Sequence, residues 1–432
     1  MSQMRVQSDV PARTFTETKV PSIPKRKLGF LTMMAICMGG VIVQGSMISA
    51  TQGVGLGGVG FIATLCIAFL LAQFNAMSFA ELSLMFSNAG TLGTYTQKAI
   101  GHFPAIVAVF AGYVVVAMLA LPAEMFLVDA VIAKLLPGMF PEKSVPLAIL
   151  LLLTLANLVG ADVFAKVQNL LAFILVTALV LFSHSALTEI AQPVPSIIGT
   201  SVEWSLSSIQ DGSFLGLIVL VMWLMVGSEY ICPMINEVHR PERNIPRVMS
   251  LSLVAMLVIF SAFAVGAGHY LSVETLTTSP LPYADYASAV FGKGGLLIAA
   301  VMGVTATCSA LNTVLAAIPR MLQGMAENGQ VFPQLALTNK RTDTPWVAIL
   351  FISGIILLPF LFFTMDSLIT LVIAASTSWL LAYVVPISMS LFCVAVFLIS
   401  TVRIGHLFTP CRRSSESWAW CISPYTTLPH RI

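Results

Sequence analysis

Ten long apolar runs constrain this 432-residue chain more than any other feature of its sequence. A helix rises about 1.5 Å per residue, so roughly 20 apolar residues cross the ~30 Å hydrocarbon layer of a membrane. The fourth run is short, and several runs contain Gly or Pro. The runs cover residues 28–51, 57–80, 104–134, 145–160, 163–184, 213–236, 247–271, 294–319, 346–364 and 367–400. We therefore expect an all-α polytopic membrane protein with about ten membrane helices.

The composition supports this class and excludes others. Hydrophobic residues make up 57% of the chain and charged residues 9%, against about 25% charged residues in soluble domains. The net charge of +2 gives no basis for binding nucleic acid. The seven cysteines show no C-x-x-C or Cys/His spacing, so we expect no metal, cofactor or disulfide. We also find no nucleophile–base pair or phosphate loop, and an enzyme is not expected.

The positions of Lys and Arg predict the orientation in the membrane. With a cytoplasmic N-terminus, all but three of the 21 basic residues fall on the cytoplasmic side, as the positive-inside rule requires. The ten runs divide into two sets of five. The expected order is a cytoplasmic N-terminal tail (1–27), a first five-helix repeat (28–184), an outer loop (185–212), a second five-helix repeat (213–400) and a polar C-terminal tail (401–432).

Two of the runs are interrupted by residues that weaken a helix. The first contains Gly39-Gly40-Val41-Ile42-Val43-Gln44-Gly45-Ser46 and the sixth contains Val226-Gly227-Ser228-Glu229. Gly lowers helix stability by roughly 1 kcal/mol relative to Ala, and in lipid an unwound turn must face protein or a water-filled cavity. Matching breaks at the start of each half predict an inverted-repeat transporter with its binding site between them.

The first break exposes main-chain groups that can bind an anion and others that can bind a cation. The N–H groups of Gly45 and Ser46 begin the outer half-helix, where the helix dipole favours an anion such as a carboxylate. Unpaired carbonyl groups, such as that of Ile42, favour a cation. A zwitterion matches this arrangement, while close packing of small residues is an equally reasonable interpretation.

Acidic and aromatic side chains add candidates. Glu229 lies within an apolar run, where a carboxylate costs about 2.5–3.5 kcal/mol, so it either carries a proton or forms a structural hydrogen bond. Trp223 is a lid over the substrate or a packing aromatic. Glu124 is a second candidate for coupling or for binding an amine. Asp129 and Lys134 are expected to pair with each other near the outer interface.

Several motifs resemble the amino acid–polyamine–organocation (APC) superfamily. Residues 223–229 followed by 236–247 are similar to its sixth-helix signature, which reads G-x-E and then E-V-x-x-P-x-R-N-I-P. Further similar pieces follow in the expected order: Glu81–Ser83, Ala89–Gly90, Tyr95, Asn157–Gly160, Lys166–Gln168, Arg320, Met325–Gly329 and Thr344–Pro345. The resemblance implies an amino acid permease or exchanger with the leucine-transporter fold, a 5+5 inverted repeat with broken helices 1 and 6.

The resemblance also implies a set of site residues. The amides of Gly45 and Ser46 would bind the substrate carboxylate, and carbonyl groups at Ile42, Trp223 and Val226 would bind its amine. Trp223 would occlude the site. The substrate-binding candidates are Ile42, Gln44, Gly45, Ser46, Trp223, Val226 and Gly227, and the candidates for coupling or gating are Glu229 and Glu124.

The chain departs from the family pattern at two places. Gln44 and Ser46 replace glycines of the first-helix motif, which leaves the shape of the pocket and the substrate open. Family members usually have twelve helices, and the last two are missing here, since residues 401–432 are too polar to form one. We expect this tail to be a truncated or frame-shifted end.

The sequence therefore predicts a permease or antiporter that moves amino acids across the cell inner membrane by alternating access, in the lipid bilayer, coupled to protons or by exchange. Two alternatives remain open. One is a transporter of polyamines or other organic cations, for which Glu124 would matter. The other is a non-transporting or inactive membrane protein.

Overall fold

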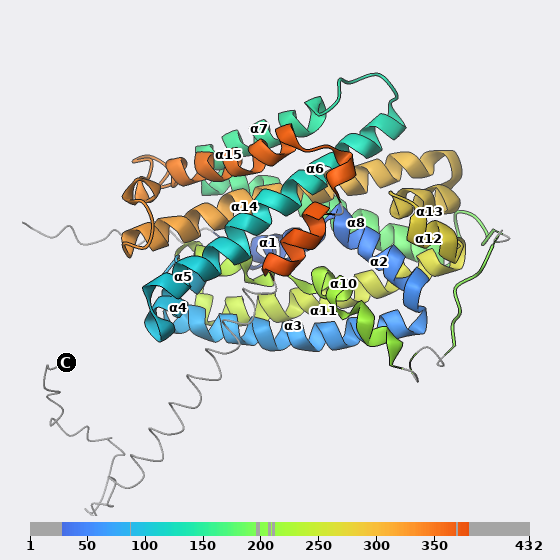
Figure 1. Cartoon of the computed structure of the whole chain (residues 1–432), viewed down its shortest axis with the longest axis horizontal. Helices are drawn as coiled ribbons and strands as arrows, with labels where there is room; N and C mark the ends of the chain where they lie inside the picture. Colours follow the sequence, from blue (N-terminus) through green and yellow to red (C-terminus); the bar gives the residue numbers. More distant parts are fainter. Residues whose placement is uncertain are drawn as a thin grey trace, which may run out of the picture. The chain divides into compact units, whose positions relative to one another are not determined.

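The computed structural model describes residues 28–379, except for 87, 196–198, 206–208, 210–211 and 369. Every named element in this part is a helix (Figure 1). An isolated parallel bridge joins Leu28 to Val238. The predicted tails 1–27 and 401–432 lie outside the described residues, as does the tenth run beyond Trp379.

The helices of the first half begin with a pair separated by a short unwound segment and end with a helix whose last three residues extend into the predicted outer loop (185–212). In chain order they are α1 (Phe30–Gly39), α2 (Gln44–Gly57), α3 (Val59–Met85), α4 (Thr91–Ile100), α5 (His102–Val109), the π-helical η1 (Phe110–Val114), α6 (Val115–Leu135), α7 (Ser144–Val159) and α8 (Ala161–Leu187).

The second half also begins with an interrupted helix, here made largely of tight 3-10 turns. Its elements are η2 (Ser213–Leu217), α10 (Ile218–Met222), η3 (Trp223–Met225), η4 (Ser228–Glu237), α11 (Pro241–Tyr270), α12 (Val273–Thr278), α13 (Pro282–Phe291), η5 (Gly292–Gly294), α14 (Gly295–Glu327), η6 (Pro333–Ala336), α15 (Trp346–Phe362) and η7 (Met365–Ser367).

The predicted apolar runs coincide with these helices as far as the described residues reach. Among the described residues, six helical stretches are long and apolar enough to cross a membrane, and the count is eight if each of two bent pairs forms one span. α7 is shorter, as its short apolar run predicted. The prediction of apolar helices is confirmed for this part of the chain, and the tenth is described only to Trp379.

Both predicted breaks are present, and they contact each other. α1 and α2 meet at an angle of 61° across residues 40–43. The unwound segment is shorter than predicted, because Gln44, Gly45 and Ser46 form the first turn of α2. In the second break Gly227 has a φ of +115°, which favours glycine. A Cβ atom there would lie only 3.1 Å from the carbonyl oxygen of Gly40.

A chain of buried amide side chains connects the helices behind the first break. Asn157 of α7 donates to Asn312 of α14 at 2.9 Å, and Asn312 donates to Oε1 of Gln168 of α8 at 2.9 Å. Gln168 in turn donates to the carbonyl oxygen of Ala35 in α1 at 2.9 Å and to Ser309 at 2.8 Å. α1 is therefore held to α8 and α14 one turn before it unwinds.

The predicted pair of Asp129 and Lys134 is wrong. Lys134 forms an ion pair of 3.0 Å with Asp285 of α13, and Asp129 accepts a hydrogen bond of 3.0 Å from the main-chain N–H of Lys143. Asp285 lies 151 residues from Lys134 along the chain, and nothing in the sequence connects the two.

The hairpin between α2 and α3 depends on a glycine with no room for a side chain. A Cβ atom on Gly53 would lie 2.2 Å from the ring of Phe61, whereas one on Gly354 in α15 would meet nothing within 4 Å. Overpacking costs about 1–3 kcal/mol, and Ala otherwise favours a helix by about 1 kcal/mol over Gly. We expect Gly53→Ala to lower the melting temperature in detergent and Gly354→Ala to keep or raise it. Equal effects of the two substitutions would contradict this packing.

Candidate functional site

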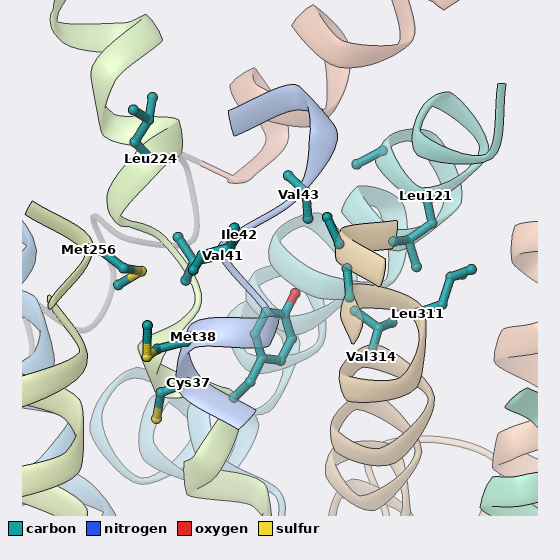
Figure 2. Packing of buried hydrophobic residues seen from close by; sticks show 14 of the residues in the cluster. Cys37, Met38, Val41, Ile42, Val43, Leu121, Leu224, Met256, Leu311 and Val314 are labelled. Carbon is teal, nitrogen blue, oxygen red and sulfur yellow. The ribbon is translucent and has the colours of Figure 1, made fainter. Parts of the chain in front are cut away.

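A pocket lies where the two breaks meet. Its cavity volume is about 50 Å³. Figure 2 shows the unwound segment that carries Val41, Ile42 and Val43, with Leu121 and Val314 on neighbouring helices. The pocket is lined by Gly40, Val41, Val43, Val116, Ala117, Ala120, Leu121, Glu124, Trp223, Val226, Tyr230, Ala310, Val314 and Trp379.

The lining is apolar except at a few points. Ala117 and Ala120 of α6 and Ala310 of α14 leave space that larger side chains would fill. Trp223 and Trp379 meet edge to face, with ring centroids 6.5 Å apart. Among the described residues that line the pocket, Glu124 is the one carboxylate, and none is Lys, Arg or His.

The carboxylate of Glu124 binds the N-terminus of α2. The main-chain N–H of Gln44 donates to its Oε2 at 2.9 Å, and that of Gly45 donates to its Oε1 at 2.8 Å. The hydroxyl of Thr307 in α14 donates to Oε2 at 3.3 Å. The first amides of a helix and its dipole both favour an anion at this place. The carboxylate of Glu124, on α6, therefore occupies the anion site at which the sequence predicts the carboxylate of a substrate.

The side chain of Gln44 fixes this arrangement from behind. Its Nε2 donates to Thr307 at 2.8 Å and to the main-chain carbonyl of Glu124 at 3.3 Å, while its Oε1 accepts from the hydroxyl of Tyr283 at 2.5 Å. A Cβ atom on Gly303 would lie 2.8 Å from both Gln44 Oε1 and the Tyr283 hydroxyl. Glycine at position 303 thus gives Gln44 and Tyr283 the space in which they meet.

Ser46 closes the unwound segment on itself. Its hydroxyl donates to the carbonyl oxygen of Val41 at 2.5 Å and accepts from the N–H of Val43 at 3.4 Å. The N–H of Ser46 donates to the carbonyl oxygen of Val43 at 3.1 Å. Ser46 therefore stabilises the turn into α2, and it does not line the pocket.

The predicted site residues divide into two groups. Glu124, Trp223 and Val226 line the pocket together. The others are not among its lining residues, and Gly227 donates its N–H to Oε2 of Glu229 at 3.1 Å. The residues of this second group are Ile42, Gln44, Gly45, Ser46, Gly227 and Glu229.

The sequence did not identify four residues that complete the site. Tyr230 and Trp379 line the pocket, and Thr307 and Tyr283 hold Gln44. Thr307 belongs to a polar stretch of α14 that also contains Thr305 and Ser309, which is a signal that could have been used. Tyr283 lies on the short helix α13, where nothing in the sequence points to the pocket.

The pocket keeps free hydrogen-bond acceptors besides the indole N–H of Trp223 and the hydroxyl of Tyr230, which can donate. Within the described part of the chain, the carbonyl oxygens of Gly40 and Val226 accept no hydrogen bond, although both residues line the pocket. Glu124 adds its carboxylate oxygens, and the rings of Trp223 and Tyr230 can face a cation. This arrangement can bind a positively charged group.

Comparisons with known proteins identify the family of the chain. The sequence profile of a family described as amino acid permease matches residues 28–422. The chain belongs to this family. An uncharacterised transporter of Mycobacterium tuberculosis is 25% identical over 349 residues, 78% of this chain and 74% of the relative. The gamma-aminobutyric acid permease of Escherichia coli is 24% identical, over 75% of this chain and 70% of the relative.

A more distant relative and a solved structure extend the comparison. The cystine/glutamate transporter of Pongo abelii is 22% identical, over 80% of this chain and 70% of the relative. The crystal structure of MhsT in complex with L-phenylalanine gives a TM-score of 0.51 at 15% identity, covering 84% of this chain and 89% of MhsT. The predicted leucine-transporter-like fold and APC membership are confirmed. This amino acid permease is a multi-pass membrane protein and a secondary transporter.

The bond between Gln44 and Tyr283 can be tested by a double-mutant cycle. Gln44→Met and Tyr283→Phe each leave a buried polar group without its partner, which costs about 1–3 kcal/mol. The double variant removes both partners, so we expect its loss of stability to be smaller than the sum of the two single losses. Thermal unfolding in detergent measures all three variants, and strictly additive losses would show that the two side chains do not interact.

Proposed function

We propose that this permease carries small solutes with a protonated amino group, amino acids or the amines related to them, across the cell inner membrane by alternating access. The observation that carries the proposal is the pocket at the meeting of two helix breaks. There the carboxylate of Glu124 and the carbonyl groups of Gly40 and Val226, which accept no hydrogen bond from the described residues, can accept from an ammonium group beside Trp223. Discontinuous helices that frame a binding site are characteristic of secondary transporters.

The names of the relatives support an amino compound as cargo. One relative is a gamma-aminobutyric acid permease, another is a cystine/glutamate transporter, and MhsT was solved with L-phenylalanine. Coupling to a proton gradient or to exchange with a second amino compound is part of the proposal. Glu229, buried beside Gly227 in the second break, is the residue we assign to proton coupling or gating.

Polar contacts near the helix ends support the alternating-access part of the proposal. Arg320 of α14 pairs with Glu237 at 2.5 Å, and Leu28 donates its N–H to the carbonyl of Glu237 at 2.9 Å. Lys134 and Asp285 pair beyond the pocket on α6 and α13. If the contacts at one end broke while those at the other end stayed intact, the helices on either side of the breaks could move. The first two helices of each repeat would then move against the third and fourth helices. The distribution of Lys and Arg supports a cytoplasmic N-terminus.

Counterflow in liposomes tests the transport proposal. Liposomes that contain the permease and are loaded with one amino compound should take up the same labelled compound faster than unloaded liposomes, because a carrier exchanges its cargo across the membrane. Ala120→Phe fills the pocket and should abolish the difference, whereas Ala133→Phe, at an exposed position of the same helix, should not. Equal uptake by loaded and unloaded liposomes across amino acids and amines would overturn the proposal.

The role assigned to Glu229 has its own test. Glu229→Gln removes the titratable proton and keeps the shape of the side chain. We expect it to flatten the dependence of the transport rate on pH while substrate affinity changes less than about threefold. Uptake is measured between pH 5 and pH 8 with binding measured in parallel. A variant with the pH dependence of the unmodified permease would exclude Glu229 from coupling.

A further inference from the structure

The first turn of α2 has no donor left for a second anion. The N–H groups of Gln44 and Gly45 donate to Glu124, and those of Ser46 and Met47 donate to the carbonyl oxygen of Val43. These are the groups that a helix N-terminus offers to a bound carboxylate. A substrate carboxylate would find each of them already engaged.

The charge of the pocket also opposes a second carboxylate. A substrate anion close to the α2 N-terminus would lie beside the carboxylate of Glu124, which is buried. Like charges repel strongly where the dielectric constant is low. Among the described lining residues there is no Lys, Arg or His to compensate the second negative charge.

The groups that remain favour a cation with an apolar body. A carboxylate has about four lone-pair sites, and three of those of Glu124 are used by Gln44, Gly45 and Thr307. The remaining lone pair of the Glu124 carboxylate and the carbonyl groups of Gly40 and Val226 can accept hydrogen bonds from an ammonium group. Alanine, valine and tryptophan side chains form most of the remaining walls, and they suit an alkyl or aromatic body.

We propose that Glu124 takes the place of the carboxylate that an amino acid would bring, so that the permease selects monoamines and rejects the matching amino acids. The proposal rests on the transport function proposed above and narrows its cargo to organic cations with one ammonium group. A diamine is disfavoured as well, because the lining contains one carboxylate and a second ammonium group would have no acidic partner there.

Matched pairs of compounds test the selectivity in the unmodified permease. Binding is measured by the shift in melting temperature in detergent and by competition in the counterflow assay. The probes are phenethylamine against phenylalanine, 3-methylbutylamine against leucine, and 1,4-diaminobutane. We expect each monoamine to bind at least tenfold more tightly than its amino acid and than the diamine.

A substitution at Glu124 tests the cause. Glu124→Ala removes the internal carboxylate and releases the N–H groups of Gln44 and Gly45. We expect affinity for the monoamines to fall at least tenfold and affinity for the matching amino acids to rise at least tenfold. Glu81→Gln, at an exposed position of α3, changes the net charge equally and should leave both affinities unchanged.

The outcomes separate this inference from the transport function. Binding and exchange of amino acids at least as tight as those of their monoamines, in the unmodified permease, would overturn the inference and leave the transport function standing. Absence of exchange with either member of any pair would overturn both. The affinities of the unmodified permease for the two members of each pair test the inference even if Glu124→Ala does not fold.

Discussion

The structure depends on how the main chain is satisfied where α1 unwinds. Inside a membrane each unpaired N–H or C=O group costs several kcal/mol unless protein or water binds it. At this break the main-chain N–H groups at the start of α2 find acceptors, whereas some carbonyl groups find no donor in the described part of the chain. Glu124 and Val43 accept from the first four N–H groups of α2, while the carbonyl groups of Gly40 and Val226 accept nothing within the described residues. The main chain of the two breaks consequently leaves acceptors, and no N–H group of the first turn of α2, for a ligand in the pocket, and the carboxylate of Glu124 adds a negative charge.

The helices around the break have the residues that this arrangement requires. Gln44 holds Thr307 and Tyr283 behind the carboxylate, and Gly303 provides the space for them. A hydrogen bond to a charged group contributes about 1.5–3 kcal/mol, so the three bonds to Glu124 favour one geometry of the break. On the other side, Gln168 anchors the last turn of α1 to α8 and α14. The unwound segment between these two anchors is short, and movement of α1 relative to α2 must be absorbed there.

The sequence predicts where the two helices break more readily than it predicts which groups meet in the site. Gly and polar residues inside apolar runs located both breaks, because a membrane helix rarely tolerates them without a reason. Glu124 was identified for the same reason, and Trp223 by its place as an aromatic just before the second break and by the family resemblance; both line the pocket. The sequence could also say that the α2 amides bind a carboxylate. It could not identify that carboxylate as the one of Glu124, because Glu124 lies 80 residues from Gln44 in the sequence. The partner Tyr283 lies 239 residues from Gln44 and could not be identified either. The error over Asp129 and Lys134 has the same origin, because neighbours in the sequence were preferred to a distant partner.

Family membership and cargo are therefore set by different parts of the molecule. The broken helices give the family its fold, and the amides at the start of α2 are present whatever side chains follow, because every residue except proline has an N–H group. A sequence cannot remove such an anion site by substituting the residues that form it. It can fill the site, and a glutamate one helix away, at a position where α6 faces the break, does so with two short hydrogen bonds. One side chain then changes the sign of the charge that the pocket receives, while the helices, their breaks and the hinge between them stay as the fold requires.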